Sequence, residues 1–419
     1  MENKCILQFV NTKRPSDVIK KSVIHLHDFG GHGFPAELSR ELASLNFQIC
    51  HCFSGDYVSG KGNISLAQTD PVNLEFVKIE TGTNFNKHSF MNRICYELLY
   101  AFKLCAHLRE KEFDFLILCN TPPIISFFVS LFVTKNSLIT WHQDIWSLAV
   151  IDELRRRKLF FSSKLLKILS FPEYISLKKS IAIVAISEDF KDFYSLLKLS
   201  TESIFYVENW APTNLIFPEK RNNEWSRTNL TKNGARRILY SGTLGHKHDF
   251  NLLVDLMDNL NLNQNGYVLT IISEGASVTA LQEIIKDRDD FIFLSFQNYS
   301  QLSQAFSAHD FCLTILSSEA AKYSVPSKVL SYLAAGAYPI AIMDPANRAS
   351  QIIVEVGGKV VPLTDSAAHD LASAIETVSS EELAKVKTNA RNYALKHFNI
   401  KKKVKVFIEI FELNSKGDE

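Results

Sequence analysis

The stretch that decides the fold is SVPSKVLSYLAAG, residues 324–336. It predicts a loop that turns into a short helix, with Ser324 as the N-cap, Pro326 where a missing N–H group costs nothing, and Gly336 as a left-handed stop. The apolar segments 311–316 and 338–343 flank it, and both are short enough to be buried parallel strands. The whole pattern is typical of a strand, loop, helix and strand unit.

The start of this predicted helix suits an anion. The first N–H groups of a helix are unpaired and carry a partial positive charge, and here Ser327 and Lys328 add a hydroxyl and an ammonium group. We therefore expect a phosphate group to bind there. On their own these residues also suit a plain helix cap at the surface, so the rest of the chain has to decide between the two interpretations.

Length and composition predict a folded, soluble protein of two or three domains. The chain has 419 residues, 46% of them hydrophobic, and a net charge of +1, which gives no reason to expect a nucleic-acid partner. The longest apolar segment, 124–133, is about half of what spans a bilayer. The amino terminus lacks the pattern of a signal peptide, so we expect a cytoplasmic protein.

The cysteines predict free thiols. There are seven, at positions 5, 50, 52, 95, 105, 119 and 312, with no Cys-x-x-Cys pair and no histidine spacing typical of zinc. An odd count and irregular spacing favour a reducing compartment. No metal site is expected from this pattern.

Short apolar segments alternate with helical patterns along the chain, which predicts an α/β fold with two Rossmann-like, doubly wound domains that face each other across a cleft. A polar segment between residues 212 and 234 without periodicity is interpreted as the linker. The expected strands are 23–26, 47–53, 113–118, 137–141, 181–186 and 204–207, then 238–240, 267–272, 291–294, 311–316, 338–343 and 359–361. The expected helices are 35–45, 90–108 and 187–199, then 250–260, 278–286, 299–308, 347–354, 367–375, 381–397 and 400–413.

Polar or glycine-rich residues follow several of the expected strands. Because the carboxyl ends of parallel strands line the ligand crevice of such sheets, these residues are site candidates, although glycines also occupy ordinary tight turns. They are Asp28 to Gly33 after the first strand, His142 to Asp144, Ser241 to His248, and Ser273 to Gly275.

Residues 155–179 form a basic amphipathic segment, with eight Lys or Arg residues and one Glu among apolar residues. One interpretation is a solvated helix face above an ordinary core face. The other is docking on an anionic membrane surface, which would bring the crevice close to a lipid-linked substrate.

These passages together resemble the retaining glycosyltransferases of GT-B family 4, and especially the bacterial branch that builds surface polysaccharides such as colanic acid and O antigen. The resemblance implies transfer of a hexose or N-acetylhexosamine from a UDP- or GDP-sugar to a saccharide acceptor, which is lipid-linked in this branch, without a metal. It implies an acceptor-binding domain over 1–212, a donor-binding domain over 213–396, and a terminal helix within 397–419 that packs on the first domain. The passages that carry it are Gly30 to Gly33, His142 to Trp146, Ser187-Glu188, Asn209 to Pro212, Tyr240 to Gly245, Pro326 to Lys328 and Tyr332 to Gly336.

The chain departs from the family pattern at one point. The family has two glutamates eight positions apart, and the second commonly contacts the ribose. Here Ser331 and Tyr323 occupy the two positions, and Glu319 is the nearest acid. Either Glu319 or backbone groups would then take over the ribose contact.

The expected mechanism needs hydrogen-bond donors and cations that stabilise the charge growing on the leaving diphosphate. The resemblance places His142 against the hydroxyls of the transferred sugar, with Asp144 orienting it or the acceptor. The catalytic candidates are therefore His142, Asp144 and Lys328. The donor-binding candidates are Gly31, His32, Gly33, Gly242, Thr243, Lys247, Glu274, Gly275, Glu319, Pro326, Ser327 and Ser331.

Two other functions fit the same features. A sugar-nucleotide 2-epimerase of the same fold would release an epimer without an acceptor. A non-catalytic scaffold in a polysaccharide assembly complex is suggested by the missing glutamate at position 331. A dinucleotide oxidoreductase is disfavoured because no acidic residue stands at the expected strand end near Phe53.

Overall fold

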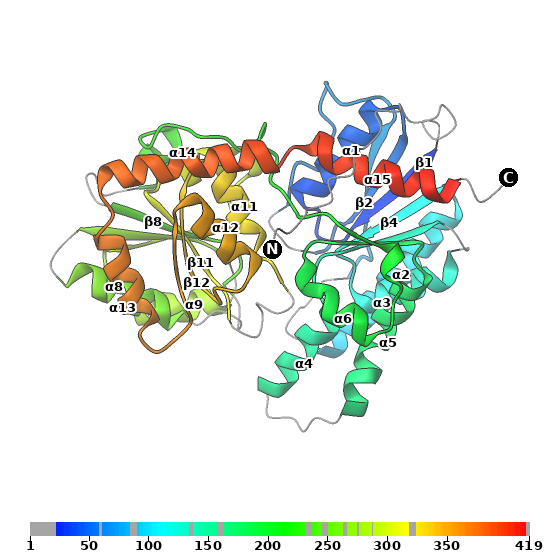
Figure 1. The fold of residues 1–419 in the computed structure, drawn as a ribbon, viewed down its shortest axis with the longest axis horizontal. Helices are drawn as coiled ribbons and strands as arrows, with labels where there is room; N and C mark the ends of the chain where they lie inside the picture. Colours follow the sequence, from blue (N-terminus) through cyan, green and yellow to red (C-terminus); the bar gives the residue numbers. More distant parts are fainter. Residues whose placement is uncertain are drawn as a thin grey trace, which may run out of the picture.

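The computed structural model describes residues 22–57, 61–83, 90–133, 137–156, 163–230, 236–244, 250–262, 266–274, 276–286, 288–317 and 324–415. Figure 1 shows two α/β domains side by side, each built on one parallel sheet. This confirms the predicted fold class.

The amino-terminal sheet has seven parallel strands in the order β3-β2-β1-β4-β5-β6-β7. The chain starts in the middle, builds one edge, and then returns to build the other, which is the doubly wound arrangement. The strands are β1 (Val23–Asp28), β2 (Gln48–Ser54), β3 (Leu74–Ile79), β4 (Phe115–Cys119), β5 (Leu138–His142), β6 (Ala182–Ala185) and β7 (Ile204–Tyr206). The helices are α1 (Gly33–Ser44), α2 (Phe90–Arg109), α3 (Pro123–Phe132), α4 (Trp146–Arg156), α5 (Ser163–Lys179) and α6 (Lys191–Leu196).

The carboxy-terminal sheet has six parallel strands in the order β10-β9-β8-β11-β12-β13. Its strands are β8 (Arg236–Ser241), β9 (Tyr267–Ile272), β10 (Phe291–Leu294), β11 (Phe311–Ile315), β12 (Tyr338–Ile342) and β13 (Lys359–Val361). Its helices are α8 (Asn251–Asn261), α9 (Ala276–Ile284), α10 (Leu302–Ser307), α11 (Ser327–Ala334), α12 (Arg348–Val356), α13 (Ala367–Glu376) and α14 (Ser380–His397).

Three local predictions were wrong. The linker contains α7 (Glu224–Asn229), which Asn223 caps and which buries Trp225. The edge strand β3 was not predicted, because its alternation is broken by the half-buried pair Phe76 and Val77. Ser324 does not cap α11, because Pro326 occupies the N-cap position. The residue before a proline favours an extended conformation, so the helix begins only after Pro326. Gly336, with φ of +62°, ends the helix as predicted.

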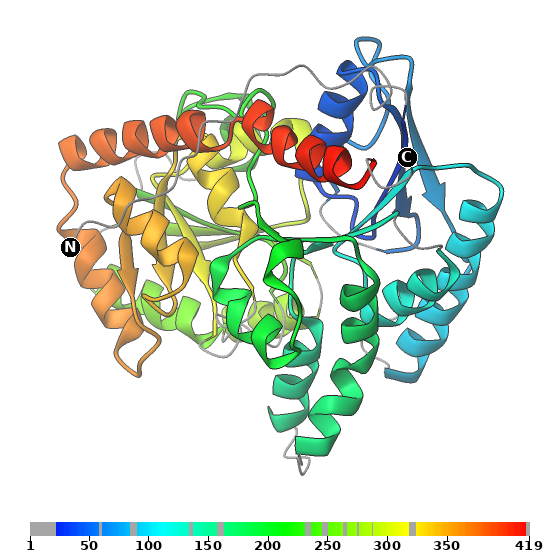
Figure 2. The same ribbon diagram turned by 45° about the vertical axis from the view of Figure 1, so that its right-hand side comes forward.

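The chain returns to the first domain at its end. In Figure 1, α14 lies along the carboxy-terminal domain and α15 (Ile400–Ser415) continues onto the amino-terminal one, and Figure 2 shows the same path from another side. Phe411 packs against Phe47 and Phe115, and Phe407 packs against Trp141. The expected terminal helix on the first domain is therefore present.

Side-chain contacts tie the two domains together. Arg348 of α12 forms an ion pair of 2.6 Å with Glu208, which follows β7. Arg391 of α14 donates hydrogen bonds to the carbonyl groups of Thr213 and Ile216, which anchors the connection that follows the first domain, and to that of Ala334. One cluster of buried apolar side chains runs from the α1 face of the first sheet to the α11 face of the second. The two sheets therefore share a core on this side.

Within the described residues, no helix is both long enough and apolar enough to cross a membrane. In both views, α4 and α5 extend away from the body of the first domain as a pair (Figures 1 and 2).

Candidate functional site

The ammonium group of Lys328, in the first turn of α11, is buried beside the carboxyl end of β8. Its Nζ atom lies 4.1 Å from the centre of the Tyr240 ring and has no hydrogen-bond partner in the described part of the chain. Burial lowers the pKa of Lys328 to about 7. A buried cation without a counter-charge is unfavourable by itself, so this position is suited to an anionic ligand.

Gly242 and the start of α11 leave space around that ammonium group. A Cβ atom at Gly242, whose φ is +121°, would come within 3.2 Å of Lys328 Cε and Nζ. No side chain caps α11, and Ser327 at its first position is exposed. The uncapped helix start and the glycine together form a place where a phosphate can approach the backbone and the ammonium group at once.

Asp28, at the end of β1, organises the glycine loop of the first domain. Its buried carboxylate accepts hydrogen bonds from the backbone N–H groups of Gly30 and His32 and from Nδ1 of His32, the last at 2.8 Å. Burial lowers the pKa of His32, but the charge of Asp28 and this hydrogen bond outweigh it, and the pKa is raised. Burial raises the pKa of Asp28, and His32 in turn lowers it below its usual value. The pair therefore favours the protonated form of the His32 ring in the loop.

The same loop meets the second domain. Gly31 has a φ of +70° and accepts a hydrogen bond of 2.7 Å from Gly62. A Cβ atom at Gly33 would lie 2.6 Å from the hydroxyl of Tyr299, so only glycine allows this contact between the domains. Because Tyr299 follows β10 and Gly33 follows β1, the carboxyl ends of the two sheets face each other here.

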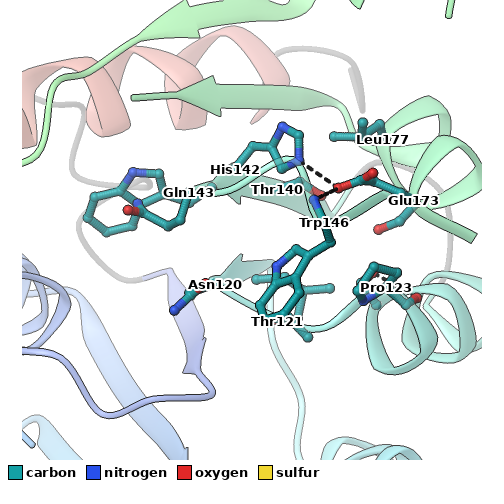
Figure 3. Close-up of a pocket in the computed structure, with 13 residues that line it drawn as sticks. Asn120, Thr121, Pro123, Thr140, His142, Gln143, Trp146, Glu173 and Leu177 are labelled. Carbon is teal, nitrogen blue, oxygen red and sulfur yellow. Dashed lines mark hydrogen bonds and ion pairs between the residues drawn. The ribbon is translucent and has the colours of Figure 1, made fainter. Parts of the chain in front are cut away.

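His142, at the end of β5, is held on both sides. Its Nδ1 atom lies 2.8 Å from the hydroxyl of Tyr194, and its Nε2 atom lies 3.1 Å from the carboxylate of Glu173 (Figure 3). Glu173 also accepts hydrogen bonds from the backbone N–H groups of Trp146 and Ser147 and from the Ser147 hydroxyl. All of these partners are buried or half-buried, so His142 and Glu173 together fix the loop between β5 and α4.

That loop carries Gln143 and Asp144. Gln143 exchanges two hydrogen bonds with Asn209, which leads into the connection between the domains. Asp144 is half-buried, and its charge raises the pKa of His32 after the larger effects of burial and Asp28. Its electrostatic influence therefore reaches the glycine loop of the same domain.

A small cavity of about 20 Å³ lies beside these residues, between the ends of β4 and β5 (Figure 3). Its wall includes Asn120, Thr121, Trp146 and Glu173. Asn120 adopts a φ of +48°, and its buried Oδ1 atom has no hydrogen-bond partner among the described residues. A cavity of this size holds about one hydroxyl group or water molecule.

The other predicted residues are placed as follows. Thr243 and Glu274 are exposed, and Glu274 accepts a hydrogen bond from the backbone of Phe296. Ser331 is half-buried on α11, four residues after the uncapped start of the helix. Lys247, Gly275 and Glu319 lie outside the described residues.

Comparisons with known proteins agree with this architecture. Residues 221–397 match the family model described as glycosyl transferases group 1. The match lies in the carboxy-terminal half and covers less than half of the chain. Its limits enclose α7 to α14 and thus the site around Lys328. No curated protein matched the sequence.

Solved structures show that the whole chain has the GT-B fold. A sucrose-phosphate synthase from Thermosynechococcus elongatus superimposes with a TM-score of 0.71 at 12% identity, over 94% of this chain and 99% of that one. WaaG, a glycosyltransferase involved in lipopolysaccharide biosynthesis, superimposes with a TM-score of 0.64 at 14% identity, over 92% of this chain and 99% of that one. HepE from Anabaena, solved in complex with UDP-glucose, superimposes with a TM-score of 0.62 at 12% identity, over 94% of this chain and 100% of that one. At these identities the likeness shows the fold.

One candidate residue of this site, Glu173, was missed from the sequence. Asp28 was expected only as the first residue of the glycine loop, and its role in organising that loop was not predicted. Glu173 carries no local sequence signal, since it lies in the middle of a helical segment, 31 residues after His142.

Proposed function

We propose that the protein is a glycosyltransferase that moves a hexose or N-acetylhexosamine from a UDP- or GDP-sugar to a saccharide acceptor, with retention of configuration and without a metal. The observation that carries the proposal is the buried ammonium group of Lys328, which has no hydrogen-bond partner among the described residues and stands at the uncapped start of α11, within the region that matches the group 1 model. The complex of HepE with UDP-glucose supports a nucleotide sugar as the donor class.

In this proposal the leaving diphosphate receives its stabilisation from both domains. Lys328 and the first N–H groups of α11, with Ser327, bind it from the carboxy-terminal side, and Gly242 gives it room. Gly31 to Gly33 supply backbone N–H groups from the other side, with His32 as a second cation. Such groups are in place before charge develops, so they favour the transition state over the bound donor. Thr243, Lys247, Glu274, Gly275, Glu319, Pro326 and Ser331 remain proposed donor contacts.

The amino-terminal residues serve the sugar and the acceptor. Asp144 is proposed to orient a hydroxyl group next to His32. His142 was predicted to contact the sugar, and that role stays a prediction. Because both ring nitrogens of His142 have buried partners, we propose that it also holds the loop that carries Asp144 in place. Asn120 lines the cavity, and its buried Oδ1 atom has no hydrogen-bond partner among the described residues, so it is proposed to accept a hydrogen bond from an acceptor hydroxyl.

We place the enzyme in family 4 and in bacterial surface-polysaccharide synthesis, as a cytoplasmic protein peripheral to the membrane. The domain roles follow the ranges 1–212 for the acceptor, 213–396 for the donor and 397–419 for the returning helix. WaaG, a glycosyltransferase involved in lipopolysaccharide biosynthesis, has the same fold, and its role supports this placement.

A screen of sugar nucleotides tests the proposed function. A donor that binds only the folded chain raises the melting temperature, and that donor is then incubated with and without membrane extract. Incorporation of sugar into extract lipid or saccharide, with release of nucleoside diphosphate, is the expected result. An epimerised donor formed without extract, or binding with no turnover in any extract, would refute the transferase proposal.

The membrane part of the proposal rests on α3 and α5. Phe171 and Ile168 of α5 are 52% and 66% exposed, and Leu131 and Phe132 at the end of the neighbouring α3 are also exposed. Exposed lysines stand on the same helix at positions 167, 178 and 179. Of the segment 155–179, the structure describes the side chains from residue 167 onward.

A double variant, Ile168→Ser with Phe171→Ser, is expected to weaken binding to anionic lipid vesicles by about 10-fold or more, because two apolar side chains no longer insert. Vesicle sedimentation measures the change. Leu262→Ser, a similarly exposed site on the other domain, is the matched control and should bind like the unaltered chain. Equal binding of the double variant would remove this surface from the proposal.

A further inference from the structure

Four metal-binding side chains meet beneath the glycine loop, on the opposite face of the amino-terminal sheet from α1. They are His25 of β1, Cys50 and Cys52 of β2, and His107 of α2. One ligand atom from each lies within 4.8 Å of the ligand atoms of the other three. His25, Cys50 and Cys52 are buried, at 1%, 4% and 1% exposure.

Two of the six distances between ligand atoms in this cluster are close to those of a tetrahedral centre, and all six are within 4.8 Å. The sulfur atoms of Cys50 and Cys52 are 3.7 Å apart, and Cys50 Sγ lies 3.8 Å from His107 Nε2. Zn–S bonds of about 2.3 Å and Zn–N bonds of about 2.0 Å in a tetrahedron place two sulfurs about 3.8 Å apart and a sulfur and a nitrogen about 3.5 Å apart. Little movement is needed for the four atoms to share one ion.

A second observation points to a ligand at the same place. The buried Nδ1 atom of His25 has no hydrogen-bond partner among the described residues, although its ring is fixed by contacts with Phe113 and His107. Buried polar atoms in native proteins almost always have a partner. An ion among the four side chains gives this imidazole a ligand to bind.

We propose that His25, Cys50, Cys52 and His107 bind a structural zinc ion. A set of two sulfurs and two imidazole nitrogens is typical of structural zinc sites, and four protein ligands leave no open position for catalysis. Two thiolates balance the charge of the ion, so it can be buried. Glu75, next to Cys50 across the strands, pairs with Lys111 at 3.4 Å and stays outside the ligand set.

The zinc ion would join β1, β2 and α2 directly below the loop that begins at Asp28. His25 lies three residues before Asp28, a distance of about 10 Å along the strand. Its loss would loosen the platform of the glycine loop, and the proposal does not depend on the transferase activity. The site has no zinc-binding sequence motif, because its ligands come from three elements and a single residue separates the two cysteines.

Metal analysis of the full chain, purified under reducing conditions, tests the proposal. We expect about one zinc per chain, and about one cobalt after exchange, with the visible charge-transfer absorption of cobalt thiolate. Removal of zinc by a chelator is expected to lower the melting temperature by roughly 5 °C or more. Cys52→Ser and His107→Gln should lose the metal, whereas Cys119→Ser, a buried free thiol in the same domain, should keep it.

A second measurement holds even where a variant fails to fold. Zinc should protect Cys50 and Cys52 of the unaltered chain from alkylation, while exposed Cys95 reacts at the same rate with and without metal. Cobalt that binds without thiolate absorption, thiols that zinc leaves unprotected, or a Cys50–Cys52 disulfide in the reduced preparation would each overturn the proposal.

Discussion

Lys328→Met is expected to lower kcat by about 100-fold or more and, at the same time, to make the unliganded protein more stable. The ammonium group acts on charge that grows on the diphosphate in the transition state, so turnover falls more than the donor KM rises. Without donor, the same group is a buried cation with no hydrogen-bond or ion-pair partner among the described residues, and an apolar side chain of similar length removes that cost. Steady-state kinetics and denaturant unfolding measure the two effects.

The gain in stability depends on pH in a defined direction. Burial lowers the pKa of Lys328 to about 7 in the folded chain from 10.5. Below pH 7 the ammonium group is charged in the folded and in the unfolded chain, so the folded protein carries the full cost of the buried charge. The Lys328→Met substitution should therefore raise the free energy of unfolding most in this pH range. From pH 7 to 10.5 the unfolded chain binds more protons than the folded one, so the cost of the buried charge falls as the pH rises. The extra stability of the Lys328→Met variant should therefore disappear over this range.

Lys387→Met is the matched control for this variant. Lys387 is also a buried lysine of the carboxy-terminal domain, but its Nζ atom donates a hydrogen bond of 2.9 Å to the carbonyl of His309. Its replacement should destabilise the domain and leave kcat nearly unchanged. A Lys328→Met protein with unaltered turnover, or one that is less stable at pH 6, would contradict the assignment of Lys328.

Glu173→Ala is expected to destabilise the amino-terminal domain by about 3 kcal/mol, because it leaves several buried donors without an acceptor. These donors are the backbone N–H groups of Trp146 and Ser147 and the Ser147 hydroxyl, and Nε2 of His142 also loses its partner. The loop that carries Asp144 should then lose its fixed position, and kcat should fall with it. Denaturant unfolding and kinetics at a temperature where the variant is folded measure both.

Glu173→Gln separates charge from geometry. The amide keeps an acceptor oxygen and the shape of the side chain, so it should recover part of the stability. Glu202→Gln, at an exposed acid of the same domain, serves as control. If Glu173→Ala unfolds like the unaltered chain, the carboxylate does not hold this loop.

The fold was predictable because parallel strands buried on both faces appear as short apolar runs. Tyr267–Ile272, Phe291–Leu294 and Lys359–Val361 have the predicted bounds. The misses have physical causes. The edge strand β3 has no strict alternation, and α7 is a six-residue helix held by Trp225 and a side-chain cap rather than by an apolar stripe.

The candidate site was predictable only where a residue stands in a recognisable local sequence pattern. Lys328 was expected as a phosphate contact and Gly242 as a donor contact, and the fold brings the two residues together. The partnership of His142 with Glu173, and the meeting of Gly33 with Tyr299, join distant segments and have no local signal. The cluster of His25, Cys50, Cys52 and His107 has the same character, since it exists only once α2 packs on the sheet.

The central claim is that the buried ammonium group of Lys328 receives the diphosphate of the donor. A crystal structure of the full chain with UDP tests it most directly. We expect a phosphate oxygen within about 3 Å of Lys328 Nζ, at the first turn of α11 and over Gly242. A diphosphate bound elsewhere, with Lys328 Nζ still unpartnered, would contradict the account.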